Sequence, residues 1–214
     1  MKTFLLGALV VLALLAAAPL VITNEYYFFA GYVVLQFVVL ATAWNILGGF
    51  AGYVNFGSAA FFAVGAYTAV ALFKAVNLPL PLQILAGAAA SGLLGFGVGL
   101  LTLRLRGIFF SIATIAITII LETAVINWSY VGGAKGLPIL RPTEAPFHFD
   151  SYMQWLFFVM GIIAVIAVAC ARYVQTSWLG RGLRAIRDNE GAAECSGVPT
   201  LQLKLIAATL SGAL

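Results

Sequence analysis

The 214-residue chain is 63% hydrophobic and only 8% charged, and its mean hydropathy is +1.07. Soluble domains carry about 25% charged residues, so this composition excludes a water-soluble globular protein. The formal net charge of +4 is small and dispersed along the sequence, which also argues against nucleic acid as a partner. The composition predicts an integral membrane protein.

Long apolar runs follow one another along the chain. A run of about 20 apolar residues matches the hydrocarbon core of a bilayer, and in lipid only helices and closed barrels satisfy the backbone. The runs are too continuous for the alternating strands of a barrel. We therefore predict an all-α polytopic membrane protein with six transmembrane helices, at residues 4–22, 27–47, 57–76, 82–103, 108–126 and 155–171.

The apolar stretches at the two ends have interpretations of their own. The first follows Met1 and Lys2 and resembles a cleaved signal peptide, but its length favours a retained helix. The last begins at Leu205 and stops at Leu214. A helix of that length rises about 15 Å, half a bilayer. We expect an unfinished seventh helix and a chain that is the N-terminal part of a longer protein.

Basic residues set the expected orientation, because they concentrate on the cytoplasmic side. With the N-terminus in the cytoplasm, six alternating spans place eight basic residues inside and three outside. The inner residues are Lys2, Arg104, Arg106, Arg172, Arg181, Arg184, Arg187 and Lys204, and the outer ones are Lys74, Lys135 and Arg141. The alternative is a re-entrant segment at 48–76, which would exchange the sides of all later loops.

Small residues recur every four positions in the fourth span, at Gly87, Ser91, Gly95 and Gly99. Such a stripe lets another helix approach closely, so we expect it to pack the bundle.

Glycines and polar residues interrupt the apolar pattern in residues 47–70. Irregular backbone at membrane depth is tolerated only against protein or a water-filled cavity. The stretch is therefore a candidate lining of a translocation path, and a tight cytoplasmic turn between two helices is the equally weighted alternative. Glu122 is the one acid inside a predicted span, a functional candidate by default, although its place near the outer end favours a structural role. The candidate path residues are Asn45, Tyr53, Asn55, Ser58 and Glu122.

The polar stretch RAIRDNEGAAECSGVP, residues 184–199, stands apart from its apolar surroundings. Asp188 and Asn189 are favourable helix N-caps. Gly197 suits the left-handed position after a helix, and Pro199 stops the helix soon afterwards. The pattern predicts a compact helical elbow at the cytoplasmic face. A basic loop held to anionic lipid headgroups would explain the arginines but not the acids.

This stretch resembles the coupling loop of ABC importer permeases, whose pattern is Glu-Ala-Ala, three residues, then Gly. Ala192, Ala193 and Gly197 match that pattern in register, whereas Gly191 stands at the position of the glutamate and Glu190 is displaced by one. The resemblance assigns a cytoplasmic coupling loop to residues 175–203. Its implied contact residues are Arg184, Arg187, Asp188, Glu190, Gly191, Ala192, Ala193 and Gly197.

Three further stretches, at 52–69, 103–117 and 127–137, are similar to the branched-chain amino acid branch of these permeases, the LivM-like subunits. The resemblance implies a single permease domain over residues 1–214 in the bacterial cytoplasmic (inner) membrane. The implied partners are a second, LivH-like permease subunit, two cytoplasmic ABC ATPases, an external substrate-binding protein and the lipid bilayer.

The sequence contains no Gly-x4-Gly-Lys-Ser/Thr phosphate loop. We therefore expect ATP and Mg²⁺ on the partner ATPase, and no enzyme activity, catalytic residue or cofactor in this chain. Its two cysteines, Cys170 and Cys195, do not form a disulfide framework or a metal site.

Three alternatives stay open at this point. A urea or short-chain amide permease would belong to the same superfamily. A secondary transporter or channel would show intramembrane acids or an internal repeat. A membrane enzyme would need clustered His, Asp or Cys, and the chain has one histidine.

Overall fold

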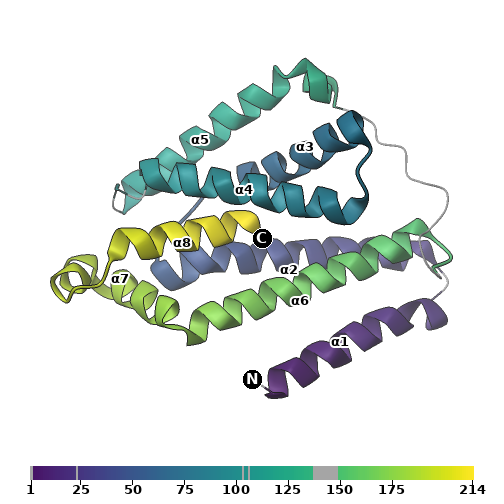
Figure 1. The fold of residues 1–214 in the computed structure, drawn as a ribbon, viewed down its shortest axis with the longest axis horizontal. Coiled ribbons are helices and arrows are strands. Elements are labelled where there is room, and N and C mark those ends of the chain that lie inside the picture. The colour runs from purple at the N-terminus through teal and green to yellow at the C-terminus, as the bar shows by residue number, and fades with distance from the viewer. Residues whose placement is uncertain (1, 23, 103, 106, 137–148) are drawn as a thin grey trace. The chain divides into compact units, whose positions relative to one another are not determined.

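The computed structural model describes residues 2–22, 24–102, 104–105, 107–136 and 149–214 (Figure 1). Within these ranges the chain is helical and contains no strand, which confirms the all-α prediction. Two short 3₁₀ turns, η1 (Ser129–Val131) and η2 (Gly133–Lys135), follow the fifth helix. The helices are α1 (Lys2–Val21), α2 (Glu25–Ala51), α3 (Ser58–Val76), α4 (Leu80–Thr102), α5 (Ile108–Ile126), α6 (Tyr152–Thr176), α7 (Trp178–Cys195) and α8 (Thr200–Ala213).

Five of the described helices, α2 to α6, are long and apolar enough to cross a bilayer, and α1 contributes a shorter apolar helix over Leu6–Val21. The chain is thus a multi-pass membrane protein. The span predicted at 108–126 has the bounds of α5, whereas α2 and α6 extend beyond the predicted 27–47 and 155–171. Hydropathy locates the lipid-crossing part of a helix, but backbone hydrogen bonding continues past it. Arg106 and Arg141 lie outside the described residues.

The contacts divide the chain into two compact units. The first unit comprises Met1–Thr42 and Ile139–Cys170, and the second comprises Ala43–Pro138 and Ala171–Leu214. In the first unit the rings of Phe28 and Phe157 meet edge to face, with their centroids 5.6 Å apart. The single permease domain over 1–214 stays a prediction.

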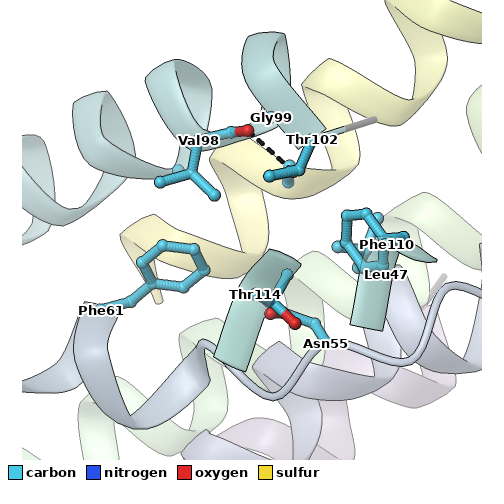
Figure 2. Close-up of a pocket in the computed structure, with 10 residues that line it drawn as sticks. Leu47, Asn55, Phe61, Val98, Gly99, Thr102, Phe110 and Thr114 are labelled. Atoms are coloured by element: carbon cyan, nitrogen blue, oxygen red, sulfur yellow. Dashed lines mark hydrogen bonds between the residues drawn. The ribbon is translucent and has the colours of Figure 1, made fainter. Parts of the chain in front are cut away.

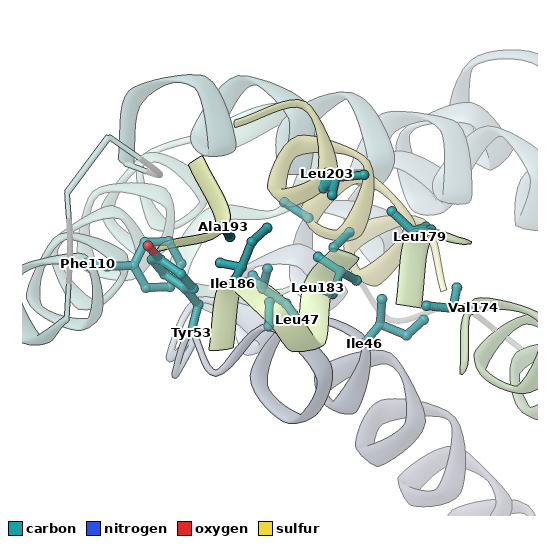
Figure 3. Packing of buried hydrophobic residues seen from close by; sticks show 13 residues of the cluster. Ile46, Leu47, Tyr53, Phe110, Val174, Leu179, Leu183, Ile186, Ala193 and Leu203 are labelled. Atoms are coloured by element: carbon teal, nitrogen blue, oxygen red, sulfur yellow. The ribbon is translucent and has the colours of Figure 1, made fainter. Parts of the chain in front are cut away.

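A buried apolar cluster holds the second unit together. The end of α2 supplies Ile46 and Leu47, the start of α5 supplies Phe110, and α8 supplies Leu203 (Figure 3). Helix α7 contributes one face, because its apolar residues follow the helical period. The buried apolar residues of α7 are Leu179, Leu183, Ile186 and Ala193.

Helix α4 packs against α3 and α8 (Figure 1), and its small residues Gly87, Ser91 and Gly95 are buried. A Cβ atom at Gly87 would come within 3.0 Å of the Gly65 carbonyl oxygen of α3. The Ser91 hydroxyl donates a hydrogen bond of 3.0 Å to the Phe61 carbonyl, also in α3. On the other side, a Cβ at Gly95 would lie 2.7 Å from a carbonyl oxygen of α8. The stripe therefore lets α4 approach both helices at backbone distance; Gly99, its fourth member, is also buried.

Candidate functional site

The chain leaves helical geometry between α2 and α3, at residues 52–57. Gly52 has φ +75°, a conformation that L side chains rarely adopt. After it, exposure alternates: Tyr53 and Asn55 are buried, whereas Val54 and Phe56 are exposed. This period of two indicates an extended segment with one face against the protein.

Hydroxyl groups of α5 satisfy the backbone of this extended segment. Ser111 Oγ donates to the Val54 carbonyl at 2.9 Å. The Phe56 N–H donates to Thr114 Oγ1 at 3.2 Å, and Thr118 Oγ1 donates to the Phe56 carbonyl at 3.5 Å. Irregular backbone inside a membrane needs such partners, because lipid offers none.

Two further bonds fix the middle and end of the extended segment. Trp44 Nε1, on α2, donates to the Asn55 carbonyl at 2.9 Å. The Asn55 side-chain oxygen accepts from the Gly57 N–H at 2.7 Å. Asn55 is only 3% exposed, so this buried side chain serves to turn the chain into α3.

The extended segment runs along the first turns of α5. Thr118 lies ten residues after Ile108, the first residue of α5, which corresponds to about 15 Å of helix rise. At the far end of α3, Lys74 Nζ donates to the Tyr130 carbonyl at 2.8 Å, beyond the end of α5. Helices α3 and α5 therefore point in the same direction, an arrangement that fits a spanning α3 better than a re-entrant one.

Removing the Thr114 hydroxyl tests whether α5 supports the extended segment. In Thr114→Val the part-buried bond from the Phe56 N–H loses its acceptor, and we expect the free energy of unfolding to fall by about 1 kcal/mol. Thr123→Val is the matched control, because the Thr123 hydroxyl is exposed and donates to the Ile119 carbonyl of its own helix. Thermal unfolding in detergent compares the two variants; an equal loss in both would contradict the support.

A small cavity lies beside the extended segment, with room for about one water molecule (Figure 2). Its polar lining comes from Asn55, Thr102 and Thr114, and the rest is apolar or glycine. Thr102 donates to the Val98 carbonyl at 2.8 Å within α4. The cavity thus connects the extended segment with the small-residue face of α4, although it is too small for an amino acid.

The elbow forms as the polar stretch predicts. Asn189 is non-helical, with φ −161° and ψ 104°, and its Oδ1 accepts from the Ala192 N–H at 3.1 Å. Asn189 therefore caps a second helical piece within α7. At the end, Gly197 adopts φ +80°, and the Val198 N–H donates to the Ala193 carbonyl at 3.0 Å. This is the glycine-terminated helix end that Gly197 and Pro199 indicate.

Three arginines on the exposed face of α7 bond to the carbonyl ends of other helices. The pairs are Arg181 Nη1 to the Thr176 carbonyl at 3.4 Å, Arg184 Nη2 to the Gln175 carbonyl at 3.3 Å, and Arg187 Nη1 to the Gly49 carbonyl at 3.0 Å. Positive charge is favourable at a helix C-terminus. The arginines therefore tie α7 to the ends of α6 and α2.

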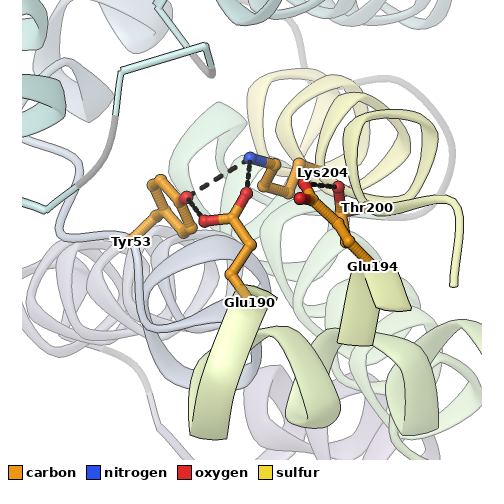
Figure 4. A network of polar contacts seen from close by, with 5 residues as sticks. All are labelled: Tyr53, Glu190, Glu194, Thr200 and Lys204. Atoms are coloured by element: carbon orange, nitrogen blue, oxygen red, sulfur yellow. Dashed lines mark hydrogen bonds and ion pairs between the residues drawn. The ribbon is translucent and has the colours of Figure 1, made fainter. Parts of the chain in front are cut away.

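A polar network joins α7, α8 and the extended segment (Figure 4). Glu190 of α7 accepts from the Tyr53 hydroxyl at 2.6 Å and from Lys204 Nζ at 2.7 Å. Lys204 Nζ also lies 3.2 Å from the Tyr53 hydroxyl and 4.9 Å from the centre of its ring. The side chains of Lys204 and Glu190 are 3% and 14% exposed, so the ion pair is buried.

The family of the chain follows from comparison with known proteins. The family model described as the permease component of branched-chain amino acid transport systems matches residues 26–214. The chain belongs to this family. It is 29% identical over 205 residues to the high-affinity branched-chain amino acid transport system permease protein LivM of Salmonella typhimurium, and likewise to that of Escherichia coli. Each alignment covers 83% of this chain and 47% of the relative, so the chain spans about half the length of these curated relatives. No solved structure matches it.

The candidate path residues of this permease chain differ in burial and in the elements that carry them. Tyr53 and Asn55 are buried in the extended segment, and Ser58 is the half-buried first residue of α3. Asn45 and Glu122 instead occupy exposed positions on α2 and α5. The path assignment stays a prediction, and the geometry favours Tyr53 and Asn55 as its structural centre.

The coupling-loop residues of the permease also divide into exposed and buried sets. Ala192 is exposed, whereas Ala193 is 5% exposed and belongs to the apolar cluster. Gly191 is half-buried. Exposed Asp188 lies 3.9 Å from Arg187 Nε. Ala193 therefore packs this chain itself, whereas Ala192 is open at the surface.

Sequence reasoning missed Lys204 and the α5 hydroxyls as site residues. The predicted seventh helix began at Leu205, but α8 begins at Thr200, so Lys204 is inside a largely apolar helix. A lone charge in such a helix is a functional signal. The hydroxyls of Ser111, Thr114 and Thr118 recur at helical spacing on a largely apolar helix, and this pattern is a second signal in the sequence.

Proposed function

We propose that this chain is a transmembrane subunit of an ATP-binding-cassette importer for branched-chain or related amino acids. The main support is the structure of α7. This amphipathic helical elbow has its apolar face in the core, and its arginines bond to the ends of α2 and α6. A partner that moves such an elbow moves the ends of two membrane helices. The family description and the names of the LivM relatives support amino acids as cargo.

The proposed assembly contains a second, LivH-like permease subunit, two cytoplasmic ATPases that carry ATP and Mg²⁺, and an external substrate-binding protein. It lies in the bacterial cytoplasmic membrane with the N-terminus in the cytoplasm. Closure of the ATPases would displace α7 and favour a second arrangement of the helices. Such a shift requires contacts that differ between the two states, and hydrolysis itself takes place on the ATPase subunits.

In this proposal the extended segment 52–57 lines part of the translocation path. Its support is the unwound backbone alongside α5, where Asn55 and Thr114 border a small and mostly apolar cavity. Broken helices commonly surround substrate sites in transporters. The cavity holds about one water molecule, so passage of an amino acid would require the elements around it to move.

An Ala192→Phe substitution tests the docking of α7. Because Ala192 is exposed, we expect the variant to insert and fold normally, to lose co-purification of the ATPase by about tenfold or more, and to lose leucine uptake. Ala134→Phe is the control, because Ala134 is exposed in η2 at the opposite ends of the helices. Normal ATPase binding by Ala192→Phe would refute docking through α7. Radiolabelled urea in place of leucine in the uptake assay distinguishes an amide importer, because only such an importer would accumulate urea.

A further inference from the structure

We propose that Tyr53, Glu190 and Lys204 are positioning residues that transmit the movement of α7 to the extended segment 52–57. The proposal rests on the proposed function, since it concerns how a displacement of the coupling loop reaches the translocation path. The three residues come from three elements: the extended segment, α7 and α8. None of them needs to touch the cargo.

The geometry gives Glu190 two partners that it holds at once. One carboxylate oxygen accepts from the Tyr53 hydroxyl at 2.6 Å, and the other accepts from Lys204 at 2.7 Å. Hydrogen bonds to an ionised group are short, strong and directional. A displacement of Glu190 by about one ångström must therefore carry Tyr53 with it or break the bond.

The extended segment is well placed to respond to such a pull. Tyr53 follows Gly52, which adopts φ +75° directly after α2, and its ring packs edge to face on Phe110 with centroids 5.1 Å apart. Beyond Tyr53, the segment is held by side-chain hydroxyls of α5 rather than by a continuous helical ladder. Side-chain bonds of this kind are easily exchanged as the backbone shifts.

Stability alone gives a weak reason for a buried ion pair here. Apolar side chains of similar volume often stabilise a protein as well as a buried pair does, and the surrounding cluster is apolar. A buried pair does, however, define one arrangement of the groups that make it. A link between a moving elbow and a path segment needs that property.

The chain offers a matched control for the link. Thr200 Oγ1 donates to Glu194 Oε1 at 2.9 Å, so a second polar bond also joins α7 to α8 (Figure 4). That bond does not include Tyr53. If polar contacts between α7 and α8 served only to hold the elbow in place, loss of either bond would have similar consequences.

The experiment uses the full-length permease, assembled with its partner subunits in proteoliposomes, and measures leucine transported per ATP hydrolysed. Tyr53→Phe removes one hydroxyl and leaves the Glu190–Lys204 pair and the ring in place. We expect this ratio to fall about fivefold or more, the lower end of a coupling between two sites, with ATPase binding unchanged and the melting temperature lowered no more than in the control. Thr200→Val, the control, removes the Thr200–Glu194 bond and keeps the wild-type ratio.

A second variant, Glu190→Gln with Lys204→Met, removes both charges together, so no single charge is left buried. We expect it to fold and to show a ratio below that of the wild type, because the Tyr53 hydroxyl then bonds to an uncharged and weaker acceptor. A wild-type ratio in Tyr53→Phe, or an equal fall in Thr200→Val, would overturn the link while leaving the importer intact. Failure of the wild-type permease to bind an ATPase would overturn the proposed function and the link together.

Discussion

Replacing Gly95 with valine should prevent α4 and α8 from packing and lower the free energy of unfolding by about 3 kcal/mol or more. A Cβ atom at Gly95 would lie 2.7 Å from the carbonyl oxygen of Ala208 and 3.4 Å from its carbonyl carbon. These atoms are backbone, so they cannot rotate away as a side chain would. The helices must separate instead, and the packing of their small residues is lost.

Gly97→Val is the matched control for this prediction. Gly97 lies two residues further along α4, and a Cβ there would meet no atom within 4 Å. The same residue type in the same helix therefore tests the contact rather than helix propensity. We expect the yield of folded protein and the melting temperature in detergent to fall only for Gly95→Val. Comparable losses in both variants would show that α8 does not pack on α4 in this way.

Replacing Lys204 alone with methionine should lower the free energy of unfolding by about 3–5 kcal/mol. The variant leaves Glu190, whose side chain is 14% exposed, without the ammonium group at 2.7 Å. An uncompensated buried carboxylate is costly because the surroundings cannot replace its hydration. The melting temperature at neutral pH measures the loss.

Adding Glu190→Gln to Lys204→Met should restore most of the stability lost in the single variant, since the unpaired charge then disappears. The Tyr53 hydroxyl keeps the glutamine oxygen as an acceptor. A double variant as unstable as Lys204→Met would mean that the lysine stabilises the fold through groups other than Glu190. The two variants thus separate the energetics of the pair from its proposed part in coupling.

The arginines of α7 show why a pattern of charge alone leaves two interpretations open. In the sequence, Arg181, Arg184 and Arg187 fit a surface that binds either anionic lipid or a protein partner. In the structure, each guanidinium bonds to a carbonyl at the end of another helix. Carbonyls at helix ends lack intrahelical donors, so the arginines stabilise α2 and α6 and join them to the elbow.

The sequence by itself determined the properties that depend on local pattern. Apolar runs predicted the membrane helices, Asn189 and Gly197 predicted the ends of the second piece of α7, and the motif at 184–199 indicated the family. These features depend on neighbours within a few residues, or on the length of a run relative to the bilayer. Such features can be recognised in the sequence without knowing which helices pack against each other.

Only the tertiary structure decided which residues face one another. The pairing of Glu190 with Lys204 spans 14 positions, and its bond to Tyr53 spans 137. The separation of exposed Ala192 from buried Ala193 likewise depends on where the apolar cluster lies. Sequence periodicity does not predict these contacts between distant residues, because helix packing, rather than local propensity, brings the elements together.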